Sequence, residues 1–113
     1  MKPSEFMMFN NLVEYKEIFK LKKKLEKANI PFVWIEHDIP SKKGYQICYP
    51  DNGIDRVCSV IEHSFSYGNE QDKLEIMGLL TPKEEESDSV VGWLSAKNVF
   101  KRIEKHYKGV NYV

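Results

Sequence analysis

The stretch YQICYPDNGIDRVCSVIEHS, residues 45–64, decides the fold. Its first half places Tyr45, Ile47 and Tyr49 at every second position, as the residues on one face of a β-strand are placed. The turn sequence Pro50-Asp51-Asn52-Gly53 follows, and Arg56 to Ser64 returns with strand-forming residues. The stretch therefore predicts an antiparallel β-hairpin at the centre of the chain.

Two further strands extend this hairpin. Phe32 to His37 is rich in aromatic and β-branched residues, and the turn residues of Asp38 to Gly44 separate it from the hairpin. After a second turn, Ser66 to Glu70, the segment Lys73 to Leu80 is compatible with a strand or a short helix. We favour the strand, because Gly78 weakens a helix and the preceding turn suits a hairpin.

A helix is expected before the strands, from about Asn11 to Ala28. Asn11 and Glu14 have the spacing of a capping box, and Asn29-Ile30-Pro31 ends the pattern. The apolar face of the helix consists of Ile18, Leu21, Leu25 and Ala28. Residues 1–10 are expected to be a flexible or helical extension of this element.

A second amphipathic helix closes the chain, from a Ser95 cap to about Tyr107, with Gly109 as the C′ residue. Its apolar face consists of Ala96, Val99, Phe100, Ile103 and Tyr107. Before it, Thr81 to Glu84 resembles a helix start, with proline at the first position. Residues 84–88 are expected to be a mobile acidic loop, and residues 90–94 are short and buried in character.

The sum is a single α+β domain over residues 1–113. It has an N-terminal helix, a three- or four-stranded antiparallel β-meander, and a C-terminal amphipathic helix packed on one sheet face. The formal net charge of zero argues against a general nucleic-acid coat. No apolar run approaches the roughly 20 residues that span a bilayer, and no signal peptide is evident. We therefore expect a cytoplasmic protein without a membrane partner, in which Cys48 and Cys58 are buried, reduced thiols.

Two lysine stripes oppose the apolar faces of the helices. The stripes are Lys16, Lys20, Lys23, Lys24 and Lys27 in the first helix, and Lys97, Lys101, Lys105 and Lys108 in the last. Solvated faces of amphipathic helices have the same composition. Nucleic-acid binding is therefore an alternative that we do not favour, and it requires both stripes on one continuous surface.

The favoured partner-binding site is the turn Ser64 to Asn69, together with Tyr45, Arg56 and His63. The expected site residues are Tyr45, Arg56, His63, Ser64, Ser66, Tyr67 and Asn69. Gly68 permits a positive φ, the polar side chains offer hydrogen bonds, Tyr67 offers a flat face, and the guanidinium of Arg56 suits phosphate or carboxylate. The competing interpretation is that Tyr67 packs inward and Arg56 pairs with Asp51 or Asp55.

Aromatic residues exceed what a small core requires, and any that stays exposed would be an anchor for a partner or a stacked base. The residues concerned are Trp34, Trp93, Tyr45, Tyr49 and Tyr67.

Catalysis is the weaker hypothesis. Glu62, His63 and Tyr67 would have to converge on one pocket, yet neighbouring residues of a strand point to opposite faces. The sequence contains no GxGxxG, P-loop, GxSxG or HExxH motif, and no metal-ligand spacing. We expect no catalytic residue, metal or cofactor.

Several segments resemble small uncharacterised proteins of phages and prophages of Gram-positive bacteria. The segments are residues 44–47, 61–68, 74–81 and 88–96, within a resemblance that covers about residues 44–107. The resemblance implies no activity. It implies an accessory protein in a bacterial host cell that binds a host protein or a nucleotide signal, for example in counter-defence. A small enzyme acting on a nucleotide or peptide is the alternative, and self-association is left open.

Overall fold

The computed structural model describes residues 14–111 of the 113-residue chain. The expected extension over residues 1–10 and the Asn11 cap lie outside the described residues. The elements follow in the order α2 (Glu17–Lys27), β1 (Val33–His37), β2 (Gly44–Tyr49), β3 (Cys58–Glu62), η1 (Asn69–Gln71), β4 (Leu74–Met77), α3 (Pro82–Ser87), β5 (Val90–Leu94) and α4 (Ala96–Asn111).

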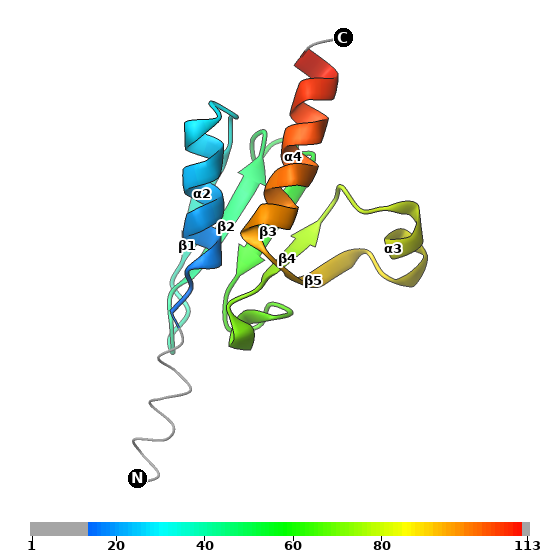
Figure 1. Cartoon of the computed structure of the whole chain (residues 1–113). Helices are drawn as coiled ribbons and strands as arrows, with labels where there is room; N and C mark the ends of the chain where they lie inside the picture. The colour runs from blue at the N-terminus through cyan, green and yellow to red at the C-terminus, as the bar shows by residue number, and fades with distance from the viewer. Residues whose placement is uncertain (1–13, 112–113) are drawn as a thin grey trace, which may run out of the picture.

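The five strands form one antiparallel sheet in chain order, β1-β2-β3-β4-β5, as Figure 1 shows. The expected α+β class and the central hairpin are confirmed, and the segment at Lys73 to Leu80 does contain a strand. The sheet has one strand more than the three or four expected. This strand is β5, which pairs with β4 through Met77 opposite Val90 and Leu74 opposite Leu94.

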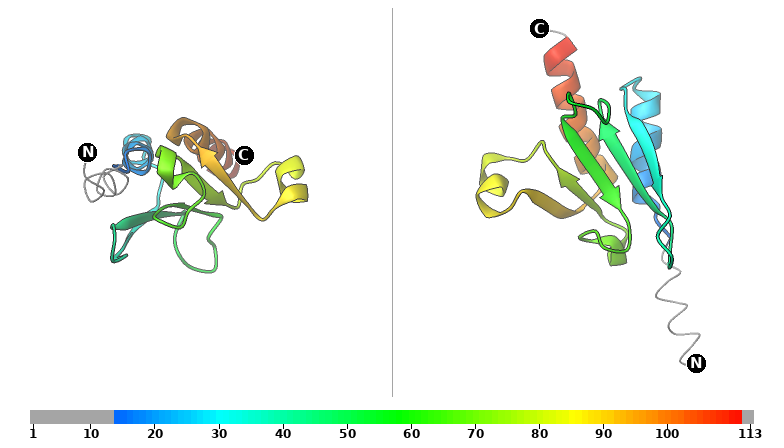
Figure 2. Two further views of the ribbon diagram at one scale, coloured as in Figure 1. Left: turned by 90° about the horizontal axis from the view of Figure 1, so that it is seen from below. Right: turned by 180° about the vertical axis from the view of Figure 1, so that it is seen from behind.

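Helices α2 and α4 lie side by side against one face of the sheet (Figures 1 and 2). Both are amphipathic, and their apolar stripes meet the inward residues of the strands. The core contains Ile18, Leu21 and Leu25 from α2, Ile47, Val60, Leu74 and Ile76 from the sheet, and Ala96, Val99 and Ile103 from α4. The apolar periodicity therefore identified the core faces of both helices, except for Ala28, which is exposed just after α2.

The opposite sheet face carries a short chain of polar side chains. The ring of His37 and the amide of Gln46 are 2.8 Å apart, and the Gln46 amide donates to the Ser59 hydroxyl at 2.7 Å. These contacts join β1, β2 and β3 across the ladder. Cross-strand pairs of this kind hold the strand register on this face.

Helix α2 begins at Glu17, and residues 14–16 before it are not helical, so the prediction of a helix through these residues was wrong. The cap is supplied from far away in the sequence: the Asp72 carboxylate accepts the amides of Lys16 and Glu17, at 2.8 and 3.1 Å. At the other end, the prediction that the helix stops before Pro31 is confirmed. Asn29 adopts φ +56° just after the last turn, as a residue that ends a helix does.

The acidic segment 84–88 is not a loop, which corrects the prediction. Most of it belongs to α3, whose Thr81 forms a complete capping box with Glu84. The Glu84 carboxylate also binds Arg102 of α4 in two hydrogen bonds, at 2.7 and 2.9 Å. Bidentate pairing with arginine explains why this acidic stretch is ordered against α4.

Helix α4 starts as predicted, because the Ser95 hydroxyl accepts the amide of Asn98 at 3.1 Å. It continues to Asn111, so Gly109 lies inside the helix rather than after it. A glycine weakens a helix by about 1 kcal/mol without preventing the next hydrogen bonds. Among residues 14–111, no helix has the length and apolar character needed to cross a membrane.

Candidate functional site

The turn between β3 and β4, residues 63–73, is held together by its own polar groups. The Ser66 hydroxyl accepts the amide of His63 at 3.0 Å and donates to the His63 carbonyl at 2.9 Å. The Asn69 amide donates to the Ser66 carbonyl, and Ser66 is only 3% exposed. The polar side chains of Ser66 and Asn69, expected to bind a partner, therefore stabilise the turn instead.

Gly68 has φ +96°, as its place in the turn sequence predicts. A Cβ on Gly68 would lie 2.9 Å from the backbone nitrogen of Trp93 in β5. The absence of a side chain at Gly68 thus lets the turn pack closely against β5, the edge strand of the sheet.

Three aromatic side chains around this turn are exposed to solvent: Phe65 at 79%, Tyr67 at 50% and Trp93 at 59%. We call these three residues the aromatic surface. The rings of Tyr67 and Trp93 lie 5.9 Å apart with planes only 3° from parallel. Residues 64–71 and Trp93 line a hollow of about 370 Å³. The interpretation that Tyr67 packs inward is therefore wrong.

Trp93 belongs to this surface, although the sequence analysis left it out of the site. It has φ +57°, a left-handed conformation that is uncommon for a bulky residue. Its amide donates to the Tyr67 carbonyl, and Gly92 before it lies against Tyr67, since a Cβ on Gly92 would be 2.3 Å from the Tyr67 Cβ. The signal in the sequence was a Gly-Trp pair in a short apolar segment.

Tyr45 and Arg56 do not join the turn. Tyr45 packs on the helix side of the sheet, with its ring 4.8 Å from Phe19 and 5.3 Å from Trp34. Arg56 lies in the β2–β3 loop at the opposite end of the strand, where it contacts Asn52 at 3.4 Å rather than Asp51 or Asp55. The strand expected over Arg56 to Ser64 is only Cys58–Glu62, so Arg56 precedes it and His63 follows it.

His63 and Glu62 lie on opposite faces of the sheet, as alternation along a strand requires. The Nδ1 atom of His63 accepts the amide of Phe65 at 3.1 Å, and burial lowers the pKa of His63. Glu62 is fully buried under α2, where its Oε1 accepts the amide of Ile18 at 3.2 Å. Glu62, His63 and Tyr67 therefore do not converge on one pocket.

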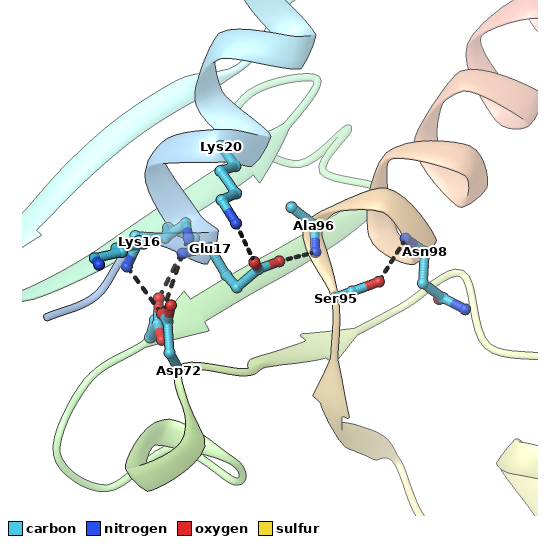
Figure 3. A network of polar contacts seen from close by, with 9 residues as sticks. Lys16, Glu17, Lys20, Asp72, Ser95, Ala96 and Asn98 are labelled. Carbon is cyan, nitrogen blue, oxygen red and sulfur yellow. Dashed lines mark hydrogen bonds and ion pairs between the residues drawn. The ribbon is translucent and has the colours of Figure 1, made fainter. Parts of the chain in front are cut away.

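Glu62 belongs to a group of carboxylates at the N-termini of the two helices, part of which Figure 3 shows. Its second oxygen, Oε2, is buried and accepts no hydrogen bond. Burial, and then the neighbouring Asp72, raise the pKa of Glu62 to about 9. A pKa this high keeps the proton on Glu62 at neutral pH, which avoids a second buried negative charge beside Asp72.

Glu17 joins the two helices directly. Its carboxylate accepts the amide of Ala96 at 2.6 Å, at the first turn of α4, and also binds Lys20 at 3.0 Å (Figure 3). Negative charge at a helix N-terminus is favourable because the amides there are unpaired and the helix dipole is positive. The acidic group thus has a structural role in capping both helices.

A second hollow, of about 590 Å³, lies between α2 and the loop that joins β1 to β2. It is lined by one carboxylate, Glu14, and by three aromatic residues, Tyr15, Phe19 and Tyr45. Its five cationic residues are Lys16, Lys20, Lys23, Lys42 and Lys43. We call it the lysine hollow.

The two lysine stripes belong to neighbouring helices. All nine lysines are exposed, and α2 and α4 are neighbours on the same sheet face. Lys24 of α2 lies over the ring of Phe100 in α4, 5.7 Å from its centroid. However, Lys20 and Lys23 line the lysine hollow beside the β1–β2 loop, whereas Lys101 and Lys105 line another hollow beside residues 79–82. Nucleic-acid binding by both stripes therefore stays a prediction.

The two cysteines are free and buried, as expected. Cys48 lies opposite Ser59 and Cys58 opposite Tyr49, so the two thiols are on different faces of the sheet. Burial raises the pKa of Cys58 to about 12, which leaves it unreactive as a nucleophile. Among residues 14–111, no group of three or more His, Cys, Asp or Glu side chains is placed to hold a metal ion.

No protein-family model, no curated protein and no solved structure matches this chain.

Proposed function

We propose that the chain is a non-catalytic binding protein that docks a partner protein on the aromatic surface. The observation that carries this proposal is the exposure of Phe65, Tyr67 and Trp93 around one hollow. Exposed aromatic side chains that gather at one place are the usual anchors of protein interfaces. Two of these rings are already fixed parallel to each other, so little side-chain freedom is lost on binding.

The backbone of Trp93 supports the same proposal. A left-handed conformation at a non-glycine residue costs of order 1 kcal/mol and is found preferentially at functional sites. Here the left-handed residue is a tryptophan, the largest side chain, and it is 59% exposed to solvent instead of being buried. A purely structural strand would place such a residue in the core.

A protein suits this surface better than a nucleotide does. The residues that line the hollow at the turn include Glu70 and no lysine or arginine, so a phosphate would find no cation there. Catalysis at this place is not favoured, because the Ser66 hydroxyl bonds the backbone of His63 and not its ring. The resemblance to phage proteins makes a bacterial host protein in the cytoplasm the partner to seek first.

The experiment is affinity capture from bacterial lysates with the wild-type chain and three variants. Phe65→Ala and Tyr67→Ala remove aromatic rings, and the second keeps the Cβ that contacts Gly92. Ile54→Ala is the matched control, because Ile54 is fully exposed in the distant β2–β3 loop. A specific partner should be retained by the wild type and the control and lost from both ring variants, with melting temperatures unchanged.

Two outcomes would contradict the proposal. One is that several bacterial lysates yield no specifically retained protein. The other is that a partner is retained equally by Phe65→Ala and Tyr67→Ala, which would place the interface elsewhere on the chain.

A further inference from the structure

The lysine hollow has the charge and the rings that an anionic aromatic ligand needs. Five ammonium groups line it against the single carboxylate of Glu14. The chain as a whole has a formal net charge of zero, so this excess is local. A concave surface lined by one sign of charge concentrates ligands of the opposite sign.

Two of the five ammonium groups, those of Lys23 and Lys42, are available to a phosphate. Lys20 is paired with Glu17 at 3.0 Å and Lys16 contacts Glu14 at 3.9 Å. Lys23 forms no ion pair with any residue in the described range 14–111. Lys43 contacts Glu36 at 3.0 Å, but both side chains are about half exposed. Exposed pairs of this kind contribute little stability, so a phosphate can compete for the lysine.

Lys42 is positioned by an aromatic ring. Its ammonium group lies 3.7 Å from the centroid of the Tyr15 ring, and a cation over an aromatic face is attracted to it. Tyr15 is itself only 7% exposed, so its ring is held in place by the surrounding core. The position of one charge in the hollow is thus set before any ligand arrives.

The aromatic wall of the hollow can receive a base. Phe19 is 39% exposed and projects from α2, although it is one of the larger apolar side chains. Its ring is held by an edge contact with Tyr45 at 4.8 Å and a tilted contact with Trp34 at 5.2 Å. A supported, partly exposed ring of this kind is a stacking platform for a nucleobase.

We infer that the lysine hollow binds a nucleotide, with its phosphate on Lys23 and Lys42 and its base against Phe19. The volume of about 590 Å³ is within the range of small-molecule sites. The same phosphate-and-base chemistry is present in a free nucleotide and in each unit of a single strand. The lysine stripe of α2 continues from the hollow through Lys24 and Lys27, which a strand could follow.

The test is fluorescence anisotropy of the full chain with a fluorescein-labelled oligothymidylate of about twelve nucleotides. ATP and inorganic phosphate serve as unlabelled competitors. Affinity should fall steeply between about 50 and about 200 mM salt, and Lys23→Gln should reduce the slope of log K against log salt by about one. Phe19→Ala should weaken binding by about fivefold or more, since it removes the stacking face.

Two controls separate this site from the rest of the molecule. Lys83→Gln removes an exposed lysine of α3 outside the hollow, and Ile54→Ala removes a fully exposed apolar side chain from the β2–β3 loop. Neither should change nucleotide affinity. If Phe19→Ala lowers the melting temperature, Phe19→Leu retains the packing and still removes the flat ring.

The competitors distinguish the two sources of the nucleotide. Displacement of the oligonucleotide by ATP indicates a free nucleotide as ligand, and resistance to ATP indicates a strand. The inference is overturned if neither ATP nor the oligonucleotide binds. It is also overturned if inorganic phosphate competes as well as ATP, or if Lys23→Gln and Phe19→Ala both bind like the wild type.

Discussion

The side-chain oxygen Oε1 of Glu62 accepts the backbone amide of Ile18, 44 positions earlier in the chain. The carboxyl group is completely buried between β3 and the first turn of α2. Four charged or titratable groups surround it. They are Tyr15 just before α2, Glu17 in α2, Asp72 from the turn before β4, and Lys42 from the β1–β2 loop. A protonated Glu62 can therefore donate to one neighbour and accept from another.

This arrangement predicts a pH-dependent stability. The folded chain keeps a proton on Glu62 up to a pKa of about 9, while the unfolded chain loses it near 4.5. The contribution is fully present below 4.5, and it is lost as the pH rises toward 9, by at most about 1.4 kcal/mol per pH unit. In Glu62→Gln the amide replaces the carboxylic acid, so this fall should disappear. Urea unfolding at both ends of the window measures it, and parallel pH profiles would refute the assignment.

The cap of α2 gives a second prediction. Asp72→Ala removes the acceptor of the Lys16 and Glu17 amides and should lower the free energy of unfolding by about 1–2 kcal/mol. Asp72→Asn keeps an acceptor and tolerates the observed φ of +53°, so it should cost less. Urea denaturation compares the two variants. Equal losses would mean that the Asp72 charge, and not its capping oxygen, is what matters.

The ion pair between Arg102 and Glu84 gives a third prediction. Arg102 also donates to the Leu79 carbonyl at 3.1 Å, so one guanidinium holds both the start of α3 and the segment before it. Lysine cannot reproduce this fork. In Arg102→Lys, amide hydrogen exchange at Glu85 and Asp88 should become faster, while exchange in β2 and β3 stays unchanged. Unaltered exchange in α3 would show that its capping box alone is sufficient.

Two glycines predict opposite effects of the same substitution. Gly92→Ala should destabilise the chain by about 1–3 kcal/mol, because the new Cβ would lie 2.3 Å from Tyr67. Gly109→Ala should stabilise it by up to about 1 kcal/mol, because Gly109 is exposed within α4 and a Cβ there meets nothing. Thermal melts decide both signs. A destabilising Gly109→Ala would instead support the C′ position expected from the sequence.

The sequence predicted the elements whose signals are local. Periodic apolar residues located the helices, and the turn residues at positions 50–53 located the hairpin, because both patterns act within a few residues. It failed at the start of α2, where the capping group is Asp72. No window of sequence around Glu17 contains a residue 55 positions away.

The candidate site was predicted in part for the same reason. The turn at residues 64–69 was recognised by its composition, and the exposure of Tyr67 is found in the structure. Trp93 reaches the site only because β5 pairs with β4. The five residues of β5 show no alternation of apolar and polar side chains, so their sequence does not predict this pairing. Tyr45 and Arg56 were assigned to the turn by residue type, whereas their positions at different ends and faces follow from strand direction.

The bond between Glu17 and Ala96 spans 79 positions and ties the first described helix to the last. The strands, in contrast, can add to the sheet one after another in chain order, through short connections that close quickly. During synthesis, the apolar stripe of α2 can pack on the strands, but its contacts with α4 form only after α4 has left the ribosome. The nascent chain therefore exposes the part of the α2 apolar stripe that α4 covers until the sixteen residues of α4 have been made.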